Sequence, residues 1–493
     1  MLIIVHDAWN SSVQTLKAHE DALGISTTIV NVSAIPGGNS HTAIKEYIQD
    51  IYDDPSRDLA FVLLVGDLED VDSFTVSGGE SDPTYSKLAG SDDYPDIIVG
   101  RLSAESAADV DTQVERIIEY ETMSTQEQSW FWDGIGIASQ DGTGDGDDSE
   151  YDWEHLRNIR TDLLGYGYMQ IDELYEGSQG SADSAGNPTD TMVSNSVNAG
   201  RGIINYTGHG SLTSWTTSGF NISDVNALTN DNMLPFIFSV ACENGNFGEQ
   251  TCFAESWMRA TNGTEPTGAI GIYASSIDQP WDPPMEAQDE FNALYVADSY
   301  KSFGAYCYAA ASSMMDDYPG VGVETFDTWH IFGDPTLRIT VQNTPPIANA
   351  GPDQSGLEGD SVRFDGSGSS DADNDPLSYL WTLTAWPVGS LASLDNPTVD
   401  KPCMTADLPG RYEVSLVVND GTVDSTPDSA EAVASDAIKE ICPCEGIDKS
   451  WQDHGKYVSC ITTTAEKYVE LGLISETEKD AIVSAAGKSA CGR

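Results

Sequence analysis

The sequence has 493 residues, with 22 lysines and arginines against 80 aspartates and glutamates, so its formal net charge is −58. This charge argues against nucleic acids and anionic membrane surfaces as partners, because both attract basic patches. The length predicts two to four domains, and no apolar run approaches the roughly 20 residues that a membrane-spanning helix needs.

The first 125 residues alternate between predicted strands and helices. Ser40 and Ser103 are the predicted start residues of two helices, each with apolar side chains on one face. Buried strands are predicted at 2–5, 61–65 and 97–99. This alternation predicts an α/β subdomain over residues 1–125, with a parallel sheet and helices on both of its faces.

A second α/β subdomain is predicted over residues 126–342. It begins with a strand at 134–138, continues through an acidic loop at 141–150, and enters a helix at about Asp152. Further strands are predicted at 203–206, 234–241 and 269–273, and further helices at 286–297 and 303–314.

The character of the sequence changes after residue 342. Short alternating segments separated by turn signals predict a β-sandwich over residues 343–431. A helical tail is predicted over residues 432–493, with two disulfides in one of three connectivities among Cys442, Cys444, Cys460 and Cys491. Because disulfides indicate an oxidising compartment, we expect a secreted protein whose signal peptide is missing from this sequence.

Two of the predicted strands end beside reactive side chains. The first is followed by Thr207-Gly208-His209-Gly210, and the second by Cys242. Because the carboxyl ends of parallel strands meet at one edge of a sheet, His209 and Cys242 are a candidate base and nucleophile. The N–H groups of Gly210 and Cys242 are then candidates for binding an oxyanion. The alternative is a buried structural cysteine and a core histidine.

Longer motifs surround this pair. They are NYTGHGSLTSW (205–215), LPFIFSVACENGNF (234–247), CFAESWMRA (252–260), FGDPTL (332–337), VLLVGD (62–67) and SDDYPDIIVGR (91–101). Together they resemble the gingipain family of cysteine peptidases over roughly residues 1–340, which implies a caspase-like α/β fold. The run at 345–383 is similar to PKD-type immunoglobulin-like modules, which implies spacing, adhesion or carbohydrate contact rather than catalysis.

The resemblance implies a role for three residues. Cys242 is the nucleophile, His209 is its general base and acid, and Glu150 is the acid that orients the imidazole, with Asp148 and Asp152 as competitors for that role. No cofactor is expected for catalysis. The resemblance leaves structural Ca²⁺ open, but its ligands are unknown from the sequence.

The same resemblance bears on substrate preference. Asp162 matches, within one residue, an acid that holds the substrate cation in arginine-cleaving members of the family. If Asp162 points into the pocket, cleavage after Arg or Lys follows by charge pairing; if it faces solvent, the preference is a different one. Trp281 and Met285 match residues that wall the first substrate pocket, and ordinary packing is the alternative for both.

The sequence therefore predicts a secreted or cell-surface cysteine endopeptidase that cleaves protein or peptide substrates through a thioester. Two alternatives stay open. One is a catalytically inactive adhesion protein. The other is a sortase-like transpeptidase linked to protein secretion, which would transfer the acyl group to an amine instead of water. The β-sandwich is expected to contact cell surfaces or carbohydrate.

Overall fold

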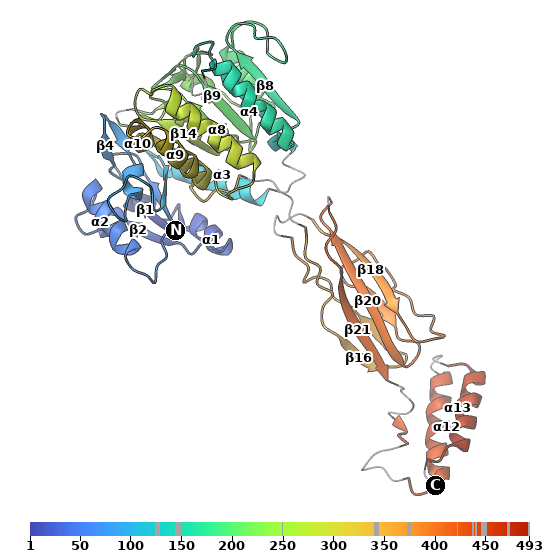
Figure 1. The fold of residues 1–493 in the computed structure, drawn as a ribbon. Helices are drawn as coiled ribbons and strands as arrows, with labels where there is room; N and C mark the ends of the chain where they lie inside the picture. The colour runs from blue at the N-terminus through green and yellow to red at the C-terminus, as the bar shows by residue number, and fades with distance from the viewer. Residues whose placement is uncertain are drawn as a thin grey trace. The chain divides into compact units, whose positions relative to one another are not determined.

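The structure is a computed structural model. It describes residues 1–123, 129–142, 149–248, 250–339, 345–371, 376–421, 423–435, 438, 441–444, 451–470 and 474–491. The chain divides into two compact units, Met1–Val341 and Gln342–Arg493 (Figure 1).

A ten-stranded sheet forms the centre of the first unit. Its strand order is β2-β1-β3-β6-β15-β14-β13-β9-β7-β8. The strands, in that order, are Thr28–Asn31, Leu2–Val5, Phe61–Val65, Ile98–Leu102, Trp329–Phe332, Gly271–Ser275, Phe236–Val240, Ile203–Thr207, Asp133–Ala138 and Gln170–Tyr175. The α/β fold that the sequence predicts is confirmed.

The sheet consists of two halves, each built of parallel strands. Strands β2, β1, β3 and β6 are parallel to one another, and so are β14, β13, β9, β7 and β8. Strand β15 lies between the two sets, where it pairs antiparallel with β14 and contacts β6 at the single pair of Phe332 and Arg101. The carboxyl ends of both halves share one edge, because Thr251 Oγ1 donates to Glu105 at 3.1 Å and Ser276 Oγ donates to the carbonyl oxygen of Glu80 at 2.8 Å.

Side chains along each strand alternate between the two faces. In β1, Ile4 shares a hydrophobic cluster with α2, whereas Val5 shares one with α1 and α3. In β13, Ile237 packs in a cluster with α5, α6 and α7, whereas Phe238 lies with α4, α8 and α9. Helices therefore cover both faces, and Figure 1 shows α4, α8 and α9 over the second half of the sheet.

The helices of this unit begin largely where the sequence predicts. They are α1 (Gln14–Ala22), α2 (His41–Tyr52), α3 (Ala107–Thr122), α4 (Asp152–Tyr166), α5 (Asp190–Asn198), α6 (Ile222–Val225), α7 (Phe253–Arg259), α8 (Asp282–Val296), α9 (Phe303–Asp317) and α10 (Val321–Asp327). Ser40 caps α2, since its side chain accepts a hydrogen bond from the amide of Ala43. The prediction for Ser103 is wrong, because Ser106 caps α3 and Ser103 is buried instead.

The second unit contains a β-sandwich and a helical tail. One sheet has the order β16-β21-β20-β18, and β17 pairs with β19. These strands are β16 (Gln354–Leu357), β17 (Ser361–Arg363), β18 (Ser378–Ala385), β19 (Cys403–Thr405), β20 (Gly410–Asn419) and β21 (Asp428–Ser435). The tail packs α12 (His454–Glu470) against α13 (Glu476–Lys488).

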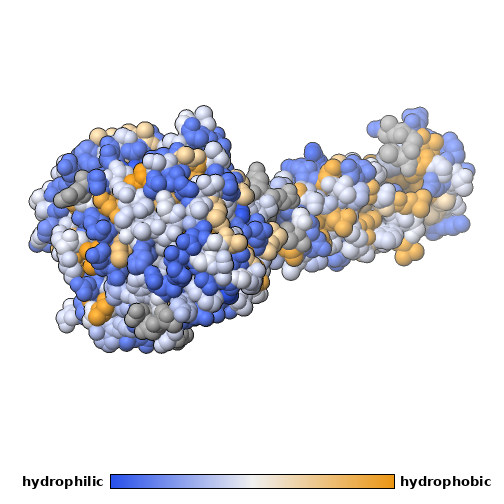
Figure 2. All heavy atoms as spheres, turned by 90° about the horizontal axis from the view of Figure 1, so that it is seen from above, coloured by the Kyte–Doolittle hydropathy of each residue, from blue (hydrophilic) through white to orange (hydrophobic). Residues whose placement is uncertain are grey.

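Two disulfides hold the tail, as predicted. Cys442 pairs with Cys460, and Cys444 pairs with Cys491. The other four cysteines are free thiols, and Cys252 and Cys307 are buried. No helix in the described part of the chain is both long and apolar enough to cross a membrane. Hydrophilic residues cover most of the face shown in Figure 2, in keeping with the net charge of −58.

Candidate active site

Several neighbouring strands of the second half-sheet end at one edge. Parallel pairing sets Val240 of β13 opposite Thr207 of β9, and Thr207 opposite Ala138 of β7. The residues that follow these strands therefore share one edge, where parallel sheets gather their chemistry. Three such residues, each two or three positions beyond its strand, are Cys242, His209 and Asp141.

A tight turn presents Cys242. The next residue, Glu243, has a φ of 56°, in the left-handed region that residues other than glycine seldom adopt. Its amide donates a hydrogen bond to the carbonyl oxygen of Ile277 at 3.1 Å. The amide of Gln279, beyond β14, donates to Cys242 Sγ at 3.4 Å. The thiol is thereby held at the strand end, and Cys242 stays partly exposed.

Asn244 joins the cysteine turn to the histidine loop. It is completely buried, and its Nδ2 donates to the carbonyl oxygens of Ser211 at 2.7 Å and Ser214 at 3.1 Å. Its Oδ1 accepts from Ser239 Oγ at 3.0 Å. Ser211 and Ser214 lie in β10 (Gly210–Ser211) and β11 (Ser214–Trp215), just after His209. One side chain thus fixes the spacing between the two reactive segments.

The backbone of Gly210 lies directly against that of Cys242. A Cβ atom on Gly210 would stand 2.5 Å from the carbonyl oxygen of Cys242 and 2.9 Å from its amide nitrogen. Glycine is therefore required at this position, because a side chain cannot fit there. The predicted oxyanion pair, Gly210 and Cys242, is brought together in space.

His209 contacts an aspartate and a tryptophan. Its Nε2 lies 3.0 Å from Asp141 Oδ2, and its ring meets the ring of Trp281 edge-on at a centroid distance of 5.2 Å. Its backbone oxygen accepts hydrogen bonds from the hydroxyl of Tyr206 and the amide of Thr216. The imidazole and the Asp141 carboxylate are each about half exposed.

A buried network supports Asp141. The amide of Asp141 donates to Ser139 Oγ at 3.0 Å, and its carbonyl oxygen accepts from the amide of Asp152 at 3.0 Å. Ser139 Oγ in turn donates to the carboxylate of Asp152. Burial raises the pKa of Asp152 to about 6. The start of α4 therefore anchors the loop that carries Asp141.

The structure corrects the prediction for Glu150. Both of its carboxylate oxygens are engaged elsewhere, because Oε1 lies 3.2 Å from Nδ1 of His155 and Oε2 accepts from Nδ2 of Asn158 at 2.8 Å. The carboxylate on the His209 ring belongs to Asp141. Of the two competitors, Asp152 bonds Ser139 and Trp281, and Asp148 lies outside the described residues.

Asp162 does not reach the site. Helix α4 starts at the catalytic edge, where Asp152 Oδ1 accepts from Nε1 of Trp281 at 2.7 Å. Asp162 lies ten residues further along, about 15 Å away at 1.5 Å per residue, and it is exposed. The prediction that Asp162 lies in the first pocket is therefore wrong in this structure.

Trp281 and Met285 have different surroundings. Trp281 precedes α8, is half-buried, and contacts both the His209 ring and Asp152, and its role as a pocket wall stays a prediction. Met285 is completely buried in the hydrophobic cluster against which Trp281 packs. The structure therefore corrects the prediction for Met285, which is core packing with no surface open to a substrate.

The electrostatic surroundings of Cys242 keep its thiol protonated. Burial is the largest cause of a pKa above the usual value of 9, and the charges of Asp278 and Glu243 raise it further. The amide of Gln279 opposes this shift by donating to the sulfur. The cysteine is thus a neutral thiol at neutral pH, and its attack requires a base.

Two groups of side chains in the described ranges have the types and spacing of metal ligands. One is His19, Glu20 and Glu121, and the other is Glu150, His155 and Asp289, with the ligand atoms of each group within 4.8 Å of one another. Neither group contains Cys242 or His209.

Comparisons with known proteins identify the two units. The model of peptidase family C25 matches residues 1–340, and that of the PKD domain matches residues 343–434. The chain belongs to peptidase family C25. Gingipain R2 of Porphyromonas gingivalis is 35% identical over 344 residues, covering 69% of this chain and 46% of that protein. The chain thus spans about half or less of the length of the curated relatives it matches.

Two similar solved structures support the assignment to this family. "Crystal structure of the Arg specific cysteine proteinase gingipain R (RGPB)" has a TM-score of 0.68 and 29% identity, covering 88% of this chain and 98% of that one. The complex of Porphyromonas gingivalis RgpB pro- and mature domains also scores 0.68, at 30% identity, covering 88% of this chain and 99% of that one. The resemblance drawn from the motifs is confirmed.

Three residues of this C25 site were not predicted from the sequence. Asp141 lies three residues after the end of β7, so the strand-end argument that selected His209 and Cys242 also applies to it. Asn244 lies inside the motif that contains Cys242, but no sequence pattern reveals that it bonds the histidine loop. Gln279 contributes a backbone amide, which carries no signal in the sequence.

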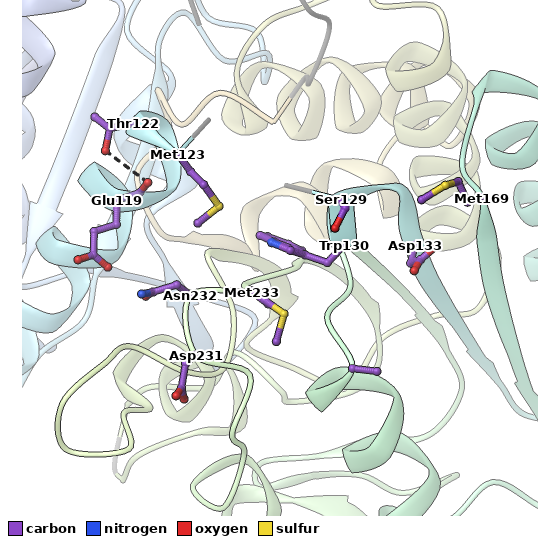
Figure 3. A pocket seen from close by; sticks show the side chains of 11 residues that line it. Glu119, Thr122, Met123, Ser129, Trp130, Asp133, Met169, Asp231, Asn232 and Met233 are labelled. Carbon is purple, nitrogen blue, oxygen red and sulfur yellow. Dashed lines mark hydrogen bonds between the residues drawn. The ribbon is translucent and has the colours of Figure 1, made fainter. Parts of the chain in front are cut away.

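A separate pocket of about 730 Å³ lies away from this site (Figure 3). It is lined by residues at the starts of β7 and β13 and the end of α3, among them Met123, Trp130, Asp133 and Met233. Because these are the amino ends of the catalytic strands, the pocket is at the opposite edge of the sheet. Its lining contains no cysteine or histidine.

Proposed function

We propose that this protein is a cysteine endopeptidase in which Cys242 attacks the peptide carbonyl, His209 transfers the proton, and Asp141 orients His209. The observation that carries the proposal is the order of the strand ends. Neighbouring strands β13, β9 and β7 deliver Cys242, His209 and Asp141 in the order in which nucleophile, base and orienting acid must stand.

The first step forms an acyl-enzyme. Because the thiol of Cys242 is neutral, His209 takes its proton as Sγ bonds to the substrate carbonyl carbon. The negative charge that develops on the carbonyl oxygen is held by the amides of Gly210 and Cys242. The C–N bond then breaks, His209 gives the proton to the departing amine, and a thioester remains on Cys242.

The second step hydrolyses the thioester. His209 takes a proton from water, the hydroxide adds to the thioester carbonyl, and the C–S bond breaks. The acid product leaves and the proton returns to Cys242. Asp141 contributes by holding Nε2 of His209 at 3.0 Å, which fixes the ring and stabilises its cationic form. No step requires a cofactor.

We propose that cleavage follows Arg or Lys. The chain shares 29% identity with a structure titled as an Arg specific proteinase. The charges of Asp278 and Glu243 act on Cys242, and Asp141 adds a third acid at the same edge, so the site has a negative potential that favours a cationic side chain. Asp162 plays no part in this preference.

A secreted or cell-surface location fits the second unit. The tail contains two disulfides, which persist in oxidising compartments. The PKD domain is proposed to place the peptidase near a cell-surface or carbohydrate partner rather than to take part in catalysis.

Labelling and cleavage together test the proposed activity. Iodoacetamide should label Cys242 selectively, and His209→Ala should abolish this selectivity while Cys403, a partly exposed thiol of the second unit, reports general reactivity. A proteome-derived peptide library should be cut after Arg or Lys. Asp278→Asn should weaken that preference, and Asp162→Asn should leave it unchanged.

Other outcomes would overturn parts of this proposal. Equal labelling of the partly exposed thiols with no cleavage would indicate an inactive binding protein. Products joined to an added amine, found by mass spectrometry, would indicate a transpeptidase. Cleavage indifferent to charge would leave the endopeptidase in place and remove the preference for Arg or Lys.

A further inference from the structure

A group of buried acids lies at the other edge of the sheet, away from the catalytic residues. Glu20 comes from α1, Glu121 from the end of α3, and Asp334 from the loop after β15. Glu20 is 1% exposed and Asp334 is 0% exposed, and the side chain of Glu121 is 3% exposed. Three carboxylates from distant parts of the chain thus converge out of contact with solvent.

These carboxylates have fewer hydrogen-bond donors around them than oxygens that need one. Glu121 accepts from the amide of Arg338 at 2.9 Å, and its other oxygen lies 2.8 Å from Nε2 of His19. Thr336 donates its amide to Asp334. Its hydroxyl lies 2.6 Å from an Asp334 oxygen and 3.2 Å from a Glu20 oxygen. A hydroxyl has one proton, so it cannot donate to both.

Two carboxylate oxygens of this group have no hydrogen-bond donor. Among the residues that the structure describes, Oε1 of Glu20 and Oδ2 of Asp334 are buried without a hydrogen-bond partner. Buried carboxylate oxygens are costly unless a donor or a cation meets them. Burial and the neighbouring acids raise the pKa of Glu20, and burial raises that of Asp334 as well. The amino group of Met1 is nearby, but it donates to the carbonyl of Ser26.

We propose that Glu20, Glu121 and Asp334 bind a divalent cation, with the hydroxyl of Thr336 and the imidazole of His19 completing its surroundings. A ring nitrogen of His19 and one oxygen each of Glu20 and Glu121 already lie within 4.8 Å of one another. Carboxylate and hydroxyl oxygens are the ligands of Ca²⁺ and Mn²⁺, and a histidine ligand favours Mn²⁺ or Zn²⁺. The bound ion would tie α1, α3 and the loop after β15 together.

Metal content and melting temperature test this site in the full chain. The Cys242→Ala variant is used throughout to prevent self-digestion. After EDTA treatment, the protein is incubated with Ca²⁺, Mn²⁺ or Zn²⁺ and gel-filtered, and bound metal is counted. One of these ions should remain bound and raise the melting temperature of the first unit by about 5 °C or more at saturation.

Substitutions then locate the ion. Glu20→Gln should bind one ion fewer, lose the thermal response, and melt no lower than the parent when metal-free, because the change relieves repulsion between acids. Asp334→Asn provides a second test should Glu20→Gln fail to fold. Asp289→Asn, in the other His–carboxylate group, is the matched control and should keep the response. His19→Gln should weaken Mn²⁺ or Zn²⁺ binding if the imidazole ligates, and leave Ca²⁺ binding intact.

Two results would overturn the proposal. If no ion alters metal content or melting temperature in the parent, the buried acids hold protons instead. If both Glu20→Gln and Asp334→Asn retain the full response, the ion binds elsewhere on this acidic chain.

Discussion

Acids at the carboxyl ends of the two halves of the sheet have different partners and different exposure to solvent. At the catalytic edge, Asp141 pairs with His209 and both side chains are about half exposed. At the carboxyl end of the first half, Arg259 meets Glu255 at 2.7 Å and Glu105 at 2.6 Å, and Glu255 is buried. A buried acid that pairs with a largely enclosed arginine stabilises the fold, whereas an acid that faces a half-exposed histidine can take part in chemistry.

The largest expected effect is on stability, at the Arg259 group. Arg259→Met removes the cation that pairs with Glu255 and leaves a buried carboxylate uncompensated. We expect the free energy of unfolding of the first unit to fall by about 3–5 kcal/mol, with kcat/KM of the folded fraction unchanged. Urea unfolding and peptide cleavage measure the two quantities. A loss of activity without a loss of stability would break the contrast between the Arg259 group and the Asp141–His209 pair.

The next effect is on catalysis. Gly210→Ala places a methyl group 2.5 Å from the carbonyl oxygen of Cys242, so the two oxyanion donors must move apart. We expect kcat/KM to fall by about 10²–10³-fold, while calorimetry still shows a cooperative transition of the first unit. A change of less than about threefold would show that these amides do not hold the oxyanion.

A pH-dependent effect is expected from Asp152. Burial raises the pKa of its carboxyl from 3.8 to about 6, so the folded state binds its proton more tightly than the unfolded state. The stability that this group contributes is present below pH 4 and is lost as the pH rises through 6. The loss amounts to about 2–3 kcal/mol.

Asp152→Asn isolates this contribution. The variant should lack that part of the decline in unfolding free energy between pH 4 and pH 7, as measured by urea unfolding against pH. Parallel curves for the parent and the variant would contradict the raised pKa of Asp152.

The smallest effect is expected at the link between the two catalytic loops. Asn244→Ala leaves the carbonyl oxygens of Ser211 and Ser214 without their donor. We expect a loss of about 1–3 kcal/mol in stability together with about a tenfold fall in kcat. Ser223→Ala, at an exposed serine outside both loops, is a control that should change neither. A loss of stability alone would show that Asn244 only fills the core.

Much of the fold could be read from the sequence, because continuous apolar runs and amphipathic helices have strong periodic signals. Strands β9 and β13 were placed to within two residues, and so were Cys242 and His209 at their ends. The reversal of direction between β14 and β15 was not predicted, because strand direction depends on long-range pairing. Ser103 was misread because Ser106 has the same capping chemistry three residues later.

The errors at the site have a common physical cause. Glu150, Asp162 and Met285 were assigned by matching positions in a family, which does not reveal where a side chain points. Glu150 turns to His155, Asp162 faces solvent, and Met285 enters the core. Asp141 could have been found from its place three residues after β7.

The central claim is that Asp141, and not Glu150, orients His209. The most direct measurement compares kcat/KM across pH for Asp141→Asn and Glu150→Gln, two substitutions that each remove one charge from the same loop. Asp141→Asn should lower kcat/KM by about 10–100-fold with little change in melting temperature, and Glu150→Gln should lower it by less than about threefold. The reverse order, with Glu150→Gln the more damaging variant, would contradict the account.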